Sequence, residues 1–173
     1  MEKYEITTML YIGGNDSMDT VKMLSDYAAA HGKPQRFVGI PKTIDNDLPL
    51  PEGTPTFGYY SAKEAGVRIS QTVYEDARTS GNWFLVSAMG REAGHLAFGM
   101  GAACHYPMII IPEMFNKVEV TFDRILNLVI SAMLKRKILG IGYGVAIISE
   151  GVFHFMTDEE IANSGVNFTY DDH

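Results

Sequence analysis

The stretch MLYIGGNDS at residues 9–17 joins a short apolar run to a turn that contains two glycines. An apolar run of this length that ends at glycine is typical of a buried strand, and Asp16 or Ser17 is the expected N-cap of a following helix. Apolar residues at helical spacing then predict a helix over residues 18–31. A second apolar run, at residues 36–40, predicts the next strand.

The rest of the chain repeats this alternation of strands and helices. Nearly continuous apolar strands between amphipathic helices are typical of a mostly parallel sheet with helices on both faces, so the expected fold class is α/β. Further strands are expected at residues 83–87, 108–111 and 145–149, and further helices at residues 59–80, 91–104, 122–137 and 158–163. The helix over residues 122–137 is expected to bury Ile125, Leu126, Val129 and Met133.

Composition excludes several classes of protein. The chain has 173 residues, of which 46% are apolar and 20% charged, as in an ordinary globular protein of one or two domains. Its net charge of −7 argues against a nucleic-acid partner, and its single cysteine, Cys104, excludes an internal disulfide. No apolar run is long enough to span a membrane, and the start is too acidic for a signal peptide. We expect a soluble, cytoplasmic protein.

The most informative loop is PKTIDND, at residues 41–47, directly after the second predicted strand. One aspartate of such a loop can accept a proton, another can hold a divalent metal, and Lys42 can neutralise phosphate charge. A surface turn rich in Asp and Asn explains the same residues.

Three other loops follow predicted strands, where ligands bind to parallel sheets. The glycines of residues 13–17 allow a phosphate to approach a helix N-terminus, although an ordinary capped turn has the same composition. Arg91, after a strand and a glycine, suits an anion, and Glu150 could accept hydrogen bonds from sugar hydroxyls. Phosphate-binding turns combined with Asp, Lys and Arg favour phosphoryl transfer.

Taken together, these segments resemble the phosphofructokinase family. The resemblance rests on the order and spacing of GGNDS (13–17), PKTIDND (41–47), MGR (89–91) with Gly94, PE (112–113) and SEG (149–151). It implies transfer of a phosphoryl group from ATP or pyrophosphate to the 1-hydroxyl of fructose 6-phosphate in glycolysis, with Mg²⁺.

The resemblance also implies roles for individual residues. Asp45 would be the base that accepts the hydroxyl proton, acting with Lys42 and Arg91. The substrate-binding residues implied are Thr43, Asp47, Met89, Gly90, Arg91 and Glu150. The phosphoryl donor would meet Gly13, Gly14, Asn15, Asp16, Ser17 and Lys42. The metal candidates are Asn15 and Asp47, and Asn15 stands where the family usually has an aspartate.

Two residues bear on the identity of the donor. In the resemblance, pyrophosphate-dependent members carry aspartate at the position of Asp16 and lysine at that of Lys42, whereas ATP-dependent members carry glycine at both. A carboxylate there would repel the α-phosphate of a nucleotide. The expected donor is therefore pyrophosphate rather than ATP.

The likeness covers the central portion of a phosphofructokinase. Residues 1–57 would belong to the phosphoryl-donor lobe and residues 58–173 to the sugar-phosphate lobe. We expect a homo-oligomer or an assembly with the missing segments. The alternative is a truncated, non-catalytic fragment that retains sugar-phosphate binding or oligomer contacts. A general nucleotide-binding domain is a weaker alternative, because the chain has neither a P-loop nor a GxGxxG turn.

Overall fold

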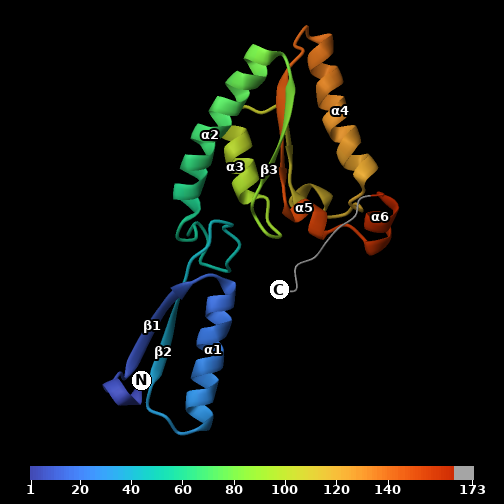
Figure 1. Ribbon diagram of the computed structural model, residues 1–173. Helices are drawn as coiled ribbons and strands as arrows, with labels where there is room; N and C mark the ends of the chain where they lie inside the picture. The colour runs from blue at the N-terminus through green and yellow to red at the C-terminus, as the bar shows by residue number, and fades with distance from the viewer. Residues whose placement is uncertain (166–173) are drawn as a thin grey trace.

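The computed structural model describes residues 1–165, and its first part is a small parallel sheet with one helix (Figure 1). Strands β1 (Thr8–Gly13) and β2 (Arg36–Pro41) pair in parallel, and helix α1 (Asn15–Ala30) connects them and packs on one face. The other face has no helix over it in the described chain (Figure 1). The expected helices on both faces are found on the larger sheet, described next, whereas this two-stranded sheet has a helix on one face within residues 1–165.

The second part is a three-stranded parallel sheet in which β5 (Gly144–Ser149) lies between β3 (Trp83–Ala88) and β4 (Met108–Ile110). All six residues of β5 are buried, because helices cover both faces of this sheet. Helices α2 (Tyr59–Ser80) and α3 (His95–Ala103) lie on one side and α4 (Phe122–Ile138) on the other (Figure 1). The α/β class with a parallel sheet is confirmed.

Side chains of β5 alternate between two apolar clusters, as the pleat of a strand requires. Val145 and Ile147 pack with Ala77 of α2 and Ala97 of α3, whereas Ile148 packs on the α4 side. Close contact of α3 with the sheet depends on Gly101. A Cβ at that position would lie 2.7 Å from Ile109 Cγ1 and 2.8 Å from Ile147 Cγ2.

The remaining described elements are short: the 3₁₀ helices η1 (Glu2–Tyr4) and η2 (Pro112–Phe115), and the helices α5 (Gly151–His154) and α6 (Asp158–Asn163). An irregular segment over residues 42–58 links the two sheets, and an isolated parallel bridge pairs Thr43 with Gly58. Within residues 1–165, no helix is long and apolar enough to cross a membrane.

Two expectations about helices are wrong in detail. The third helix begins at His95 rather than at residue 91. On α4, Ile125 is buried as expected, but Leu126 is 55% exposed and Met133 37% exposed. The helical spacing identified an apolar face correctly, but the described part of the chain covers only one side of it.

Candidate functional site

The first turn of α1 lies beside the carboxyl end of β1. The helix begins at Asn15, with Gly14 as an extended N-cap that supplies no side-chain cap. Asp16 or Ser17 was expected to cap the helix; instead both lie within its first turn. The N–H groups of an uncapped first turn attract anions, because they combine free donors with the positive end of the helix dipole.

The turn after β2 is joined directly to the turn after β1. The backbone N–H of Lys42 donates to the carbonyl oxygen of Gly13 at 2.8 Å. The buried Thr43 then fixes the half-buried Asp45: its Oγ1 donates to Asp45 Oδ2 at 2.8 Å and accepts from the Asp45 N–H at 3.1 Å. This carboxylate therefore has a defined orientation, whereas Asp47, two residues later, is exposed.

The turn after β3 is held by a carboxylate from the neighbouring strand. Glu150 Oε1 accepts the backbone N–H groups of Gly90 and Arg91, each at 2.9 Å. Arg91 has φ +53°, a left-handed conformation that does not fit a regular helix. Arg91 was expected at a helix N-terminus; it lies in a turn instead, because the Glu150 carboxylate holds the amides there.

Two further side chains form hydrogen bonds with the backbone of the same turn. The fully buried Ser149 donates through Oγ to the carbonyl oxygen of Ala93 at 2.9 Å, and Glu113 Oε1 accepts the N–H of Gly94 at 2.9 Å. The turn is thus attached to β5 and to η2 by side-chain hydrogen bonds. These bonds fix the backbone of the turn, and they therefore fix the position from which the Arg91 side chain extends.

The three turns enclose one cavity of about 320 Å³. It contains two cationic side chains, Lys42 and Arg91, and two carboxylates, Asp16 and Asp45. Charged groups of both signs in one cavity suit a ligand that carries phosphate and exchanges a proton. The lining residues are Gly14, Asn15, Asp16, Ser17, Lys42, Thr43, Ile44, Asp45, Met89 and Arg91.

Four of the expected site residues do not line this cavity: Gly13, Asp47, Gly90 and Glu150. Gly13 and Gly90 act through their backbones, as described above. Glu150 lies behind the turn after β3 and contacts it through Oε1. Asp47 is exposed and belongs to none of these contacts.

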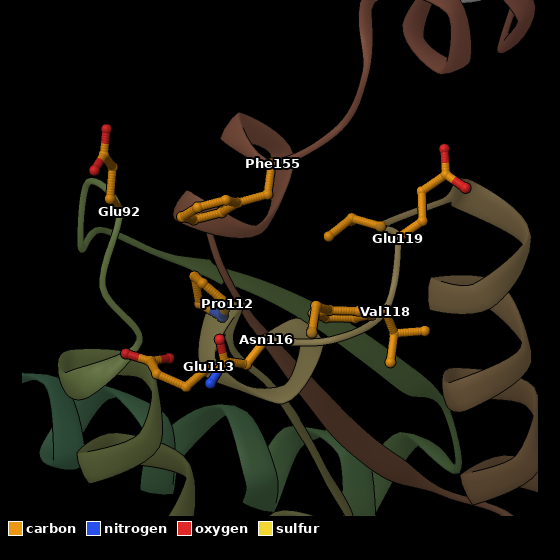
Figure 2. Close-up of a pocket in the computed structure, with 9 residues that line it drawn as sticks. Glu92, Pro112, Glu113, Asn116, Val118, Glu119 and Phe155 are labelled. Atoms are coloured by element: carbon orange, nitrogen blue, oxygen red, sulfur yellow. The ribbon is translucent and has the colours of Figure 1, made fainter.

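A larger cavity, of about 480 Å³, also borders the turn after β3, at Glu92. Glu92 contributes to it from the turn after β3, Pro112 and Glu113 from η2, and Phe155 from the end of α5 (Figure 2). The carboxylates of Glu92, Glu113 and Glu119 lie apart around this cavity (Figure 2), and Glu113 is occupied by the N–H of Gly94. The sequence did not single out this cavity, and its charged groups do not converge.

The donor set of the smaller cavity fits Mg²⁺ bound together with phosphate. Carboxylate oxygens of Asp16 and Asp45 and the amide oxygen of Asn15 are hard ligands. No cluster of three or more His, Cys, Asp or Glu residues able to hold a metal occurs within residues 1–165. The two carboxylates and one amide of this cavity match the usual Mg²⁺ site, in which one or two carboxylates act with substrate phosphates and water.

The chain is similar to known proteins over nearly its whole length. The family model described as Phosphofructokinase matches residues 1–169. A pyrophosphate–fructose 6-phosphate 1-phosphotransferase of Thermotoga maritima is 41% identical over 163 residues, covering 94% of this chain and 38% of that protein. A protein of the same name from Naegleria fowleri is 37% identical, covering 100% of this chain and 41% of that protein.

A solved structure gives the same result. The pyrophosphate-dependent phosphofructokinase from Marinobacter aquaeolei superimposes with a TM-score of 0.68 at 26% identity, covering 94% of this chain and 41% of that chain. The chain thus spans between 38% and 41% of the length of these relatives. With the family model matched from residue 1 to residue 169, the chain belongs to the phosphofructokinase family.

Proposed function

We propose that the cavity between the three turns binds pyrophosphate and fructose 6-phosphate for phosphoryl transfer to the sugar 1-hydroxyl. The observation that carries this proposal is the convergence of Lys42, Arg91, Asp16 and Asp45 on one cavity. The names of the relatives from Thermotoga maritima and Naegleria fowleri support it, because they specify this donor and this acceptor.

In the proposed reaction, the 1-hydroxyl oxygen of fructose 6-phosphate attacks a phosphorus atom of pyrophosphate. The bond from that phosphorus to the bridging oxygen breaks, and the products are fructose 1,6-bisphosphate and orthophosphate. Asp45 accepts the hydroxyl proton through Oδ1, because Thr43 Oγ1 donates to the other oxygen, Oδ2. Lys42 and Arg91 stabilise the charge on the transferring and leaving phosphates.

Mg²⁺, when bound with the diphosphate, would supply further charge neutralisation. We assign its protein ligands to Asn15 and Asp16, which line the cavity from the first turn of α1 and leave Asp45 free to act as the base. Asp47, the other candidate from the sequence, is exposed and does not line the cavity.

We assign the donor to the first turn of α1 and the sugar to the turn after β3, where Met89 and Arg91 line the cavity. Residues 1–57 would then form part of a phosphoryl-donor lobe and residues 58–173 part of a sugar-phosphate lobe. The separation of β1 and β2 from the larger sheet supports this division. In this arrangement Glu150, which does not line the cavity, holds the turn after β3 through Oε1.

A second candidate function is ligand binding without turnover. It is favoured by the length of the chain, which spans 38% of the Thermotoga maritima relative. Other chains or segments would then complete the catalytic site. Binding that is measured without product formation would identify this case.

Binding of magnesium pyrophosphate by isothermal calorimetry tests the proposed cavity. Replacing Lys42 by Met should weaken this binding about tenfold to a hundredfold, because it removes a charge-assisted contact to phosphate. Lys22, on α1 but outside the cavity, provides the matched control, and Lys22→Met should bind as the wild type does. Equal affinity in all three proteins would refute the assignment of Lys42.

A further inference from the structure

Asp45 lies in a segment that has no regular secondary structure to hold it. Residues 42–58 form neither a helix nor a named strand, and only an isolated bridge pairs Thr43 with Gly58. A side chain that must meet a substrate to within a few tenths of an ångström needs another source of order. The hydrogen bonds of the segment provide it.

Thr56 is bonded to both sides of Asp45. Its hydroxyl donates to the carbonyl oxygen of Thr43 at 2.8 Å, and its backbone N–H donates to Asn46 Oδ1 at 2.9 Å. Thr43 in turn bonds the Asp45 carboxylate and its N–H. Asp45 is thus enclosed between two residues that are both attached to Thr56.

The burial of these groups makes the hydrogen bonds costly to lose. Thr56 is 3% exposed and Thr43 8% exposed, so water cannot readily replace a missing partner. Asn46 has φ +60°, a left-handed conformation that asparagine tolerates better than most residues. Its side chain is therefore suited to this turn as well as to the bond with Thr56.

From these contacts we infer that Thr56 is a positioning residue for Asp45. Through Thr43 and Asn46 it sets where the Asp45 carboxylate stands in the cavity. The inference rests on the proposed function only for the consequence in catalysis. The structural part, an ordered Asp45, concerns the free protein and is measured without substrate.

Amide hydrogen exchange by NMR on the ligand-free chain tests the structural part. Thr56→Val keeps the shape and the backbone N–H but removes the hydroxyl, and it should raise the exchange rate of the Asp45 amide about tenfold. Thr56→Ser retains the hydroxyl and should restore the wild-type rate. Exposed Thr54 supplies the control Thr54→Val, which should leave the rate unchanged.

Asn46→Gly provides a second variant, in which Thr56 itself is not replaced. Glycine accepts the positive φ but lacks the side-chain acceptor, so it should raise the exchange of the residue 56 amide. Amides of β5 report on the fold, and they should exchange at the wild-type rate in all of these variants. Wild-type exchange at Asp45 in Thr56→Val, or failure of Thr56→Ser to restore it, would overturn the inference.

Kinetics on the same proteins separate this inference from the proposed function. With magnesium pyrophosphate and fructose 6-phosphate, Thr56→Val should lower kcat about tenfold to a hundredfold at nearly constant KM, and Thr56→Ser should recover it. Faster exchange with unchanged kcat would refute the catalytic consequence. If the variants show the predicted exchange pattern but the wild-type chain shows no turnover, the positioning of Asp45 is supported and the proposed reaction is refuted.

Discussion

Asp16 and Lys42 line one cavity from two different segments of the chain. Asp16 belongs to the first turn of α1, and Lys42 follows β2, where its N–H is bonded to Gly13. A carboxylate in this place repels an additional phosphate, whereas an ammonium group attracts a small dianion or trianion. The pair thus provides a physical reason for a preference between pyrophosphate and a nucleotide.

Replacing both residues by glycine should shift donor preference towards ATP. Asp16→Gly removes the repulsion of the α-phosphate, and Lys42→Gly removes the charge that favours a short diphosphate. We expect the ratio of the kcat/KM values for pyrophosphate and ATP to fall at least about tenfold, measured with fructose 6-phosphate at saturation. An unchanged ratio would show that other residues select the donor.

Much of the site could be predicted from the sequence because its residues lie in short motifs next to strand ends. Lys42, Thr43 and Asp45 share one loop, and the parallel sheet determines that such loops meet. Thr56 could not be found in this way, since its role depends on a fold that returns the chain to Thr43 after an irregular segment. Asp47 belongs to the same motif but does not line the cavity, and its role stays a prediction.

At the scale of elements, hydrophobic patterning predicted the strands and long helices, but not every helix start. The pattern cannot show that the Glu150 carboxylate accepts hydrogen bonds from the backbone N–H groups of Gly90 and Arg91, which lie 60 and 59 positions earlier in the chain. These bonds keep the residues before His95 in a turn. Likewise, Gly14 caps α1 although the neighbouring Asp16 has the better capping side chain.

One contact between elements gives the fold a pH dependence. The Tyr106 hydroxyl, beyond the end of α3, donates to the carbonyl oxygen of Ser70 on α2 at 2.7 Å and is buried. Burial raises the pKa of Tyr106 above its ordinary value of 10.0; the side chain of Ser70 lowers it by a smaller amount, and Cys104 adds to the rise. Because the folded pKa is the higher one, this stabilising contribution is present below about pH 10 and is lost as pH rises through the folded pKa.

Tyr106→Phe should therefore lower the free energy of unfolding at neutral pH by about 1 kcal/mol, because it removes the hydrogen bond to Ser70. It should also lose less stability than the wild type between about pH 8 and about pH 11. Urea unfolding at several pH values measures both effects. Tyr27→Phe, at an exposed position, is the control, and parallel pH curves for wild type and Tyr106→Phe would contradict the assignment.

At the scale of the whole molecule, apolar side chains are exposed on two faces. On the small sheet, Leu10 is 63% exposed and Ile12 67% exposed, on the side opposite α1. On α4, Ile138 is 85% exposed. Apolar faces of this kind, next to strand edges that lack a partner within residues 1–165, favour association with another polypeptide.

We expect the 19.1 kDa chain to elute from a sizing column as a species larger than a monomer. Leu10→Lys places a charge on the open face of the small sheet and should shift the elution towards the monomer. Gln71→Lys, on an exposed position of α2, adds the same charge elsewhere and should not. Light scattering in line with the column provides the mass, and a wild type that elutes as a sharp monomer would contradict the expected association.

The most direct measurement of the central claim is fructose 1,6-bisphosphate formation by the 173-residue chain with Mg²⁺ and fructose 6-phosphate, with pyrophosphate and ATP compared as donors. The proposed function predicts product with pyrophosphate, little with ATP, and a loss of about a hundredfold or more in Asp45→Asn. Product formed with ATP alone, or turnover with pyrophosphate that survives unchanged in Asp45→Asn, would contradict it.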